Sequence, residues 1–245
     1  MTLRNRLSLC LVLPLGWFSA YGQSLDGAGR DLTPAADGSS RQVQTSFRFE
    51  DWQRRVRAGG REVNLDMRRA VLAGEWAMGQ GASLWGEGGW NDPDFAGGEG
   101  GSGLTWGAGG AWRALRAPLR TDPEFGPREW VALLLSGGLR GGSADDADGE
   151  ITWTQLEGRL GVEWRNPHLL PRRAGSGLQG WTLDGGLVWN SLEADRGDID
   201  GSESEEVGFY GRMMYQLSQT THAGVEVDWF GGSDRRLAFA ASYRF

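Results

Sequence analysis

The chain has 245 residues, a formal net charge of −7 at pH 7 and a mean hydropathy of −0.43. The acidic balance gives no reason to expect a nucleic-acid partner, and the low hydropathy excludes a helical membrane protein. Glycine (41 residues) and tryptophan (13) are unusually frequent, and abundant glycine without a triplet repeat favours many turns and closely packed strands.

The N-terminus has the form of a secretory signal peptide. Residues 1–6 carry two arginines, residues 7–18 form an apolar core too short to cross a bilayer as a helix, and residues 20–22 offer small side chains for cleavage. We expect residues 1–22 to be removed on export; the alternative is an N-terminal anchor. Cys10, the only cysteine, lies in this segment, so the exported chain would have no disulfide and no thiol.

Residues 23–40 are rich in Gly, Ser, Asp and Ala and show no hydrophobic period. Such a composition is typical of a flexible leader. We therefore expect the folded domain to span residues 41–245.

Ten strand-like segments follow the leader. Most alternate apolar and polar residues, and turn residues separate them. The expected strands are residues 42–52, 63–78, 82–90, 104–112, 130–140, 152–164, 181–189, 207–217, 223–229 and 235–245. Their typical length, about nine to eleven residues, suits a tilted strand that crosses a bilayer.

The second segment changes its hydrophobic phase. Its apolar residues are Val63, Leu65 and Met67 in the first half, and they move to the other parity from Ala70 onward. One extra residue in a strand shifts the phase in this way. We therefore expect a β-bulge near Arg68 and Arg69.

The lengths of the connections alternate. Tight turns at residues 79–81 and 218–220 would lie on the side where the chain ends, and the connections at residues 91–103, 141–150, 190–206 and 231–235 would lie on the opposite side. Two connections on the first side, residues 113–129 and 165–180, are long for this arrangement. Eight or twelve strands therefore remain open alternatives.

Aromatic residues gather near the strand ends, as expected for side chains at a membrane interface. One expected girdle contains Trp76, Trp112, Trp130, Trp164, Trp181, Tyr215, Tyr243 and Phe245, and the other contains Trp90, Trp106, Trp189, Phe209 and Trp229. Trp85 and Trp153 fall on the other parity. Together with the even strand number, the girdles predict an all-β fold, a closed antiparallel transmembrane β-barrel of about ten strands.

The opposite face of the strands is charged and would line the interior. The residues expected there are Glu75, Glu87, Glu157, Arg159, Glu163, Asp184, Arg212, Glu226, Asp228 and Arg244, and acids outnumber arginines in this set. In the terminal strand, Arg236 is also expected to face the interior. One interpretation is a structural salt-bridge network; the alternative is a narrow polar path for solutes or ions.

Catalytic and ligand-binding signals are weak. The two histidines, His168 and His222, lie at turns, and Ser218 near His222 is the single serine–histidine candidate, with nothing else to mark a nucleophile and base. The acidic runs at residues 145–150 and 195–206 lack a full calcium-loop pattern. We expect no enzyme, no catalytic, cofactor-binding or metal-binding residues, and no cofactor.

Two stretches carry a family resemblance. Residues 72–89, a Gly-aromatic pair before a tight turn and then an alternating strand, resemble a hairpin of small outer-membrane β-barrels of Gram-negative bacteria. The ending Ser242-Tyr243-Arg244-Phe245 resembles the C-terminal signal of that family. The resemblance implies a location in the outer membrane and recognition of Phe245 by the barrel assembly machinery.

The expected role is structural or surface-interacting, through acidic extracellular loops that contact lipopolysaccharide, divalent ions or host and environmental ligands. Outer-membrane lipid and lipopolysaccharide are the expected surroundings of the barrel. The alternatives are a narrow channel for polar solutes or ions and an outer-membrane enzyme, a protease or lipid hydrolase.

Overall fold

The fold is that of a closed, all-β barrel. The computed structural model describes residues 43–58, 60–79, 81–95, 100–122, 126–146, 149–166, 180–196, 199–202, 206–217, 221–232 and 234–244. The expected signal peptide, the expected leader and Phe245 lie outside these ranges.

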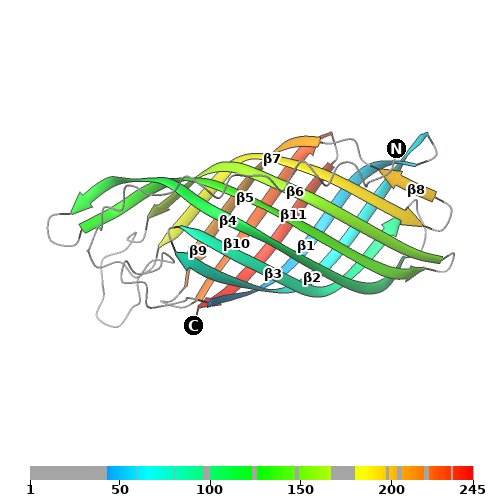
Figure 1. The fold of residues 1–245 in the computed structure, drawn as a ribbon, viewed down its shortest axis with the longest axis horizontal. Helices are drawn as coiled ribbons and strands as arrows, with labels where there is room; N and C mark the ends of the chain where they lie inside the picture. The colour runs from blue at the N-terminus through cyan, green and yellow to red at the C-terminus, as the bar shows by residue number, and fades with distance from the viewer. Residues whose placement is uncertain are drawn as a thin grey trace, which may run out of the picture.

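Within the described ranges, eleven strands make up one antiparallel sheet, which Figure 1 shows wrapped into a barrel. They are β1 (Val43–Ala58), β2 (Arg61–Gly79), β3 (Ala82–Phe95), β4 (Gly100–Asp122), β5 (Gly126–Asp146), β6 (Gly149–Asn166), β7 (Trp181–Arg196), β8 (Ile199–Ser202), β9 (Glu206–Gln216), β10 (Thr221–Gly231) and β11 (Asp234–Arg244). We call the end where β1 begins and β11 finishes the terminal end, on the left in Figure 1, and the other end the far end.

Pairing of the first and last long strands closes the barrel. Phe49 of β1 lies opposite Ala70 of β2 on one side and Phe239 of β11 on the other. Closure leaves no sheet edge along the body of the barrel. All strands except β8 belong to this ring, so the expectation of ten barrel strands is confirmed and the alternatives of eight and twelve are wrong.

The register fixes the tilt of the strands. The chain of directly opposite residues that starts at Phe49 and passes through β2, β3, β4, β5 and β6 ends at Asp195 of β7. The chain of opposite residues that leaves Phe49 in the other direction, through β11, β10 and β9, ends at Leu183 of β7. These two residues are twelve apart. In a ten-stranded barrel that stagger corresponds to a strand tilt of about 40°.

Many strands are much longer than the sequence predicted. The regions expected as connections at residues 141–150 and 113–129 are mostly strand, because β5 runs from Gly126 to Asp146 and β4 extends to Asp122. At the end of β5 the outward residue Asp145 is polar and the inward residue Ala144 is apolar, so a rule of apolar residues outward does not identify this segment as strand.

The far end is closed partly by β8, which the sequence analysis did not predict. β9 begins at Glu206 and β10 ends at Gly231, well short of the end of β7 at Arg196. β8 pairs with the end of β7 and with the last residues of β1, opposite Arg57 and Ala58. β8 therefore connects β7 to β1 at the far end, beyond the point where β9, β10 and β11 stop (Figure 1).

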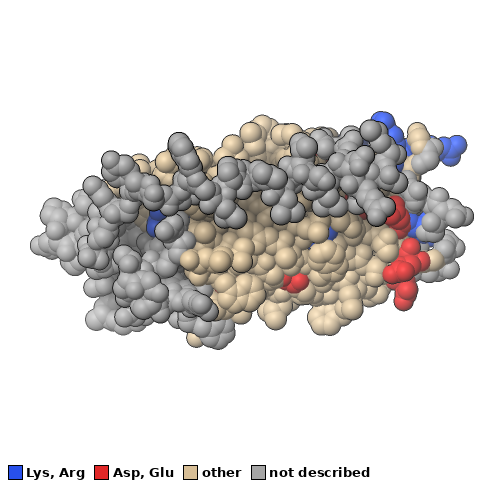
Figure 2. Space-filling view, in the orientation of Figure 1, with Lys and Arg blue, Asp and Glu red and all other residues tan. Residues whose placement is uncertain are grey.

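A broad apolar belt surrounds the outside of the barrel. Its exposed members include Phe47, Phe49, Leu72, Trp76, Leu84, Trp90, Leu104, Trp106, Leu139, Leu156, Leu160, Val162, Leu187, Val207, Phe209, Met213, Val227, Trp229, Phe239 and Tyr243. In Figure 2 this belt is largely tan, and charged side chains gather at the right-hand, far end. The alternation expected for the terminal strand is confirmed, because Leu237, Phe239 and Tyr243 face outward and Arg236 is buried inside.

β2 passes from the apolar belt into the part of the barrel beyond it without a change in backbone alternation. Its even-numbered residues face outward throughout, from Met78 and Leu72 in the belt to Arg68 beyond it, and its pairing with β1 and β3 is regular in this region. The bulge predicted near Arg69 is therefore wrong. The apolar residues change parity because the apolar side of the strand changes. Leu72, in the belt, faces outward, whereas Leu65 and Met67, nearer the far end, face inward into a buried core.

Neighbouring strands undergo the same change. In β3 the outward series passes from Trp90 to Asp92 and Asp94, while the inward series passes from Glu87 to Phe95. The inward apolar residues meet in one cluster, which we call the far-end core. It consists of Trp52, Val56, Ala58, Leu65, Met67, Phe95, Ile151, Trp153, Leu192 and Ala194. The barrel thus has a polar interior inside the belt and an apolar interior beyond it.

Glycines make room for the large side chains inside. A Cβ atom at Gly138 would lie 2.3 Å from the Trp85 ring, one at Gly161 would lie 2.2 Å from the Tyr210 hydroxyl, and one at Gly107 would lie 2.9 Å from Glu87. These distances are below van der Waals contact, so a larger residue would displace the neighbouring side chain. The abundance of both glycine and tryptophan follows in part from this arrangement, in which a glycine on one strand leaves space for a large side chain from a neighbouring strand.

We expect Gly138→Val to destabilise the barrel by about 1–3 kcal/mol or more, because its side chain would overlap the Trp85 ring. Urea unfolding of the protein in lipid vesicles, followed by heat-modifiable gel mobility, measures the change. The control is Gly211→Ala, where an added Cβ meets nothing within 4 Å. Equal stabilities for the two variants would contradict the steric explanation.

Candidate functional site: the barrel interior

The interior contains three regions in order from the far end. The far-end core comes first, a layer of buried ion pairs follows, and a polar chamber extends from that layer toward the terminal end. Alternation along each strand positions all of these side chains, because every second residue points inward. The interior is where the charged residues meet, so it is the candidate site.

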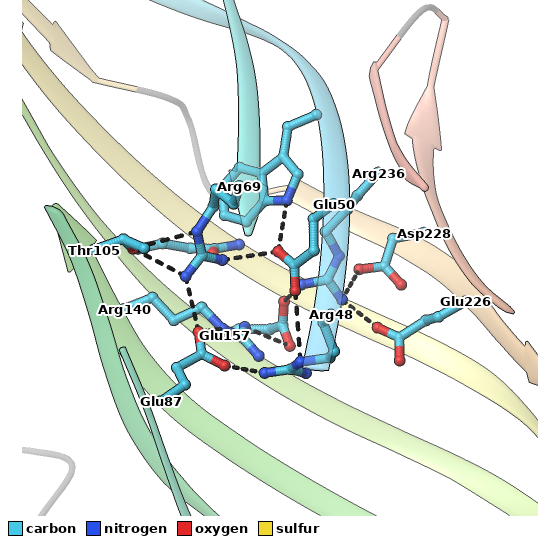
Figure 3. A network of polar contacts seen from close by, with 12 residues as sticks. Arg48, Glu50, Arg69, Glu87, Thr105, Arg140, Glu157, Glu226, Asp228 and Arg236 are labelled. Carbon is cyan, nitrogen blue, oxygen red and sulfur yellow. Dashed lines mark hydrogen bonds and ion pairs between the residues drawn. The ribbon is translucent and has the colours of Figure 1, made fainter. Parts of the chain in front are cut away.

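The ion-pair layer joins side chains from β1, β2, β3, β5, β6, β10 and β11 (Figure 3). It contains five arginines, Arg48, Arg69, Arg140, Arg159 and Arg236, and five carboxylates, Glu50, Glu87, Glu157, Glu226 and Asp228. Equal numbers of the two signs make the layer electroneutral. Neutrality matters here because an unpaired buried charge is costly.

Arg69 is the centre of one half of the layer. Its side chain is fully buried, and its terminal nitrogens lie 2.8 Å from Glu50 and 2.8 Å from Glu87. It also donates a hydrogen bond of 3.0 Å to Thr105 Oγ1, and that hydroxyl donates to the carbonyl oxygen of Gly141 at 3.0 Å. One guanidinium therefore ties together β1, β2, β3 and β4.

Arg159 and Arg236 organise the other half. Arg159 lies 2.9 Å from Glu157 and 2.9 Å from Asp228, and Arg236 lies 2.7 Å from Asp228. Both arginines also contact Glu226. Arg140 links the two halves, because it lies 3.0 Å from Glu87 and 3.1 Å from Glu157.

Strand alternation predicts the inward direction of most of these residues correctly. Of the interior charges expected from the sequence, all except Arg244, whose side chain is not described, face inward. In the ion-pair layer itself the two signs are equal in number, because it also contains arginines that were not expected inside. The inward direction of Arg69 was not predicted, because the expected bulge at this residue left its side undetermined. The inward direction of Arg140 was not predicted either, because the nearly continuous apolar run before it does not show which residues face inward.

Aromatic rings join the ion-pair layer to the far-end core. Trp52 and Trp153 meet edge to face at 5.5 Å, and the Arg69 guanidinium lies 5.2 Å and 5.1 Å from their ring centres. Trp52 Nε1 donates a 3.0 Å hydrogen bond to Glu50. Trp153 does not belong to either aromatic girdle because its ring faces inward, where it contacts the buried Arg69 cation.

The chamber has a volume of about 170 Å³. Arg113, Asp184 and Arg212 line its wall; Arg212 lies 2.7 Å from Asp184, and Arg113 lies 3.1 Å from the buried Glu163. Glu75 lies 4.0 Å from Arg113. The far-end core and the ion-pair layer separate this chamber from the far end of the barrel.

Two aromatic predictions have different outcomes. Trp90, Trp106, Phe209 and Trp229 are exposed on the belt, as predicted. Trp130 was expected in a girdle, but it is buried and faces inward, where Arg116 and Arg165 lie 4.1 Å and 4.8 Å from its ring. The continuous apolar run that begins at Trp130 conceals the parity of β5.

The candidates for chemistry are only partly covered. His168 and Ser218 lie outside the described residues, and His222 faces the interior with Gln216 and Ser242 as its cross-strand neighbours. Among the described residues, no group of three or more His, Cys, Asp or Glu side chains is arranged to hold a metal ion. None of the described residues belongs to a helix long and apolar enough to cross a membrane.

The acidic runs are not simple loops where they are described. Asp145 is in β5 and Glu150 is in β6, and Asp195 is the penultimate residue of β7. These carboxylates are exposed on paired strands. Also beyond the belt, partial burial and, to a smaller extent, the carboxylates of Asp94 and Asp51 raise the pKa of Asp66.

Comparison with known proteins gives a fold-level likeness. No protein-family model and no curated protein sequence matches the chain. The translocator domain of the autotransporter NalP from Neisseria meningitidis is 12% identical over 83% of this chain and 86% of its own, with a TM-score of 0.38. The beta domain of the Bordetella autotransporter BrkA is 13% identical over 84% and 99%, with a TM-score of 0.36. The chain is a β-barrel that resembles these domains.

We expect Arg69→Met to cost about 3–5 kcal/mol of stability, because it leaves buried carboxylates short of a partner. Urea unfolding measures the loss. Adding Glu50→Gln to the same chain should restore at least half of it, since the new amide oxygen can still accept the hydrogen bond from Trp52. A single variant as stable as the parent, or no recovery in the double variant, would contradict the account of the layer. Arg57→Met, at an exposed outward position, is the control.

Proposed function

We propose that the chain is an integral outer-membrane β-barrel protein that is closed to solutes and presents its far end at the cell surface. The observation that carries the proposal is the change of hydrophobic parity along the strands. An outward apolar belt needs a lipid environment, whereas an outward polar surface around an apolar core needs water.

The dimensions of the belt support membrane insertion. At a tilt of about 40°, about ten residues of each strand cross the roughly 25 Å apolar band of such a barrel. β2 has 19 residues and β6 has 18. The additional residues carry the polar outward faces and the far-end core, so this part of the barrel would stand out of the membrane as a rigid extension.

The orientation follows from the usual arrangement of such barrels, in which both chain ends lie on the periplasmic side. The terminal end would then face the periplasm and the far end would face outward. The resemblance of the C-terminal residues 242–245 to an assembly signal supports the same orientation, with the barrel assembly machinery as the partner that recognises Phe245.

A structural or surface-interaction role is the best-supported function within this proposal. Exposed carboxylates such as Asp94, Asp145, Glu150 and Glu193 lie on the outward faces of the extension. Because paired strands hold them, they would present a fixed acidic surface to lipopolysaccharide, its bridging cations or other surface ligands. The proposal assigns no catalytic step to the protein.

The channel alternative has less support. Several members of the far-end core, including Leu65, Phe95, Ile151 and Leu192, have no exposed surface. A close-packed apolar core of this kind leaves no room for water. A conducting path would require this core and the ion-pair layer beneath it to separate.

Labelling of introduced cysteines in intact cells tests the location and the orientation together. The mature chain would contain no cysteine of its own. A membrane-impermeant maleimide should label Glu150→Cys at the far end, but it should label Leu217→Cys at the terminal end only after the outer membrane is permeabilised. The reverse pattern would contradict the orientation, and labelling of neither site in permeabilised cells would contradict the exposure of both positions.

Planar-bilayer recording tests the closed state. We expect no single-channel steps from the purified parent protein, because the far-end core blocks the interior. A general porin incorporated into the same bilayers is the positive control. Reproducible steps from the parent protein would favour the narrow-channel alternative.

A further inference from the structure

Three ion pairs around the chamber share one orientation. The side chain of Arg212 is 31% exposed and that of its partner Asp184 is 1% exposed. For Arg48 and Glu87 the values are 20% and 0%. For Arg113 and Glu163 they are 10% and 0%, so in each pair the carboxylate is buried in the wall and the guanidinium faces the chamber.

These arginines approach the chamber from different sides. Arg48 is on β1, Arg113 on β4 and Arg212 on β9. In the order of the ring, β4 and β9 are each three strands away from β1, in opposite directions. All three line the same chamber, so inward side chains approach it from three parts of the ring.

Two of the guanidiniums have donors to spare. Arg212 donates to Asp184 through Nε at 2.7 Å, and Arg113 donates to Glu163 through Nε at 3.1 Å and 3.2 Å. A guanidinium carries five N–H donors, and the pair of terminal nitrogens matches the two oxygens of a carboxylate or phosphate. The nearest approach of Arg113 to Glu75 is 4.0 Å, which is longer than a hydrogen bond.

We propose that the chamber binds a small oxyanion, a carboxylate or a phosphate, between these guanidiniums. The buried carboxylates neutralise the arginines from behind and hold them in place, while the N–H donors remain directed at the chamber. A cavity of about 170 Å³ is of the size that accommodates a benzene-sized molecule. Glu75, whose side chain is 38% exposed, also lines the chamber 4.0 Å from Arg113 and disfavours an anion on that side, so Arg48 and Arg212 are the main donors.

Isothermal titration of the purified full chain in detergent micelles tests the proposal. Sodium phosphate and sodium acetate are the probes, with sodium chloride replacing them at constant ionic strength. Both oxyanions should bind saturably. The double variant Arg212→Gln with Asp184→Asn removes the charged guanidinium without leaving a buried charge, and should weaken binding by about tenfold or more.

The matched control is Arg55→Gln with Asp234→Asn. This pair has the same geometry, Nε to carboxylate oxygen at 2.8 Å, but lies at the far end outside the chamber. Its binding should stay within about twofold of the parent. Because the double variant could fail to fold, Arg212→Lys, which keeps the charge and loses the paired donors, is measured alongside and should also bind more weakly than the parent.

Three results would overturn the proposal: no saturable heat for either probe with the folded parent protein, equal losses in the chamber variant and its control, or unchanged binding by Arg212→Lys. Heat-modifiable mobility establishes that each titrated sample is folded. None of these measurements depends on the orientation or the location of the barrel in a cell, so they separate this inference from the proposed function.

Discussion

The structure depends on one constraint: every strand has two faces, and the environment of each face changes along its length. In the belt, a charged residue facing lipid would cost about 2–4 kcal/mol for Arg at mid-depth, so Leu72 faces outward and Arg69 inward. Farther along the same strand Arg68 faces outward and Leu65 inward. Backbone alternation is uninterrupted between them, and only the distribution of apolar residues is inverted. A single β-sheet thereby combines a barrel with an apolar outside and polar inside and an extension with a polar outside and apolar inside.

The buried charges follow from the same constraint. A barrel with an apolar outside must place its polar residues inside, where desolvation is costly unless each charge has a partner. The five arginines and five carboxylates of the ion-pair layer meet this requirement across seven strands. Glycines such as Gly107 provide the space that Glu87 and Arg140 need. The layer and the far-end core then close the interior, and the remaining space is the chamber, which Arg48, Arg113 and Arg212 face together with Glu75.

Much of the architecture could be predicted from the residues, and the failures have a common cause. The ten barrel strands, the outward face of the terminal strand and the inward direction of Glu87, Glu157 and Asp228 all follow from alternation. The bulge, the supposed loops and the omission of Arg69 arose because alternation was interpreted with one rule, apolar outward, over the whole length of each strand. β8 is too short to leave a periodic signal. The chamber depends on which partner of each ion pair is buried, and spacing in a sequence does not contain that information.

Spin-label accessibility along β2 tests the central claim most directly. Single nitroxides placed at each position from residue 62 to residue 78, in vesicles, report collisions with apolar oxygen and with a water-soluble nickel complex. The account predicts that even-numbered positions remain the accessible ones throughout, and that they change from nickel-accessible to oxygen-accessible between Arg68 and Ala70. A shift of accessibility from even to odd positions at that point would contradict the account, because it would show that the strand contains a bulge and has one apolar face.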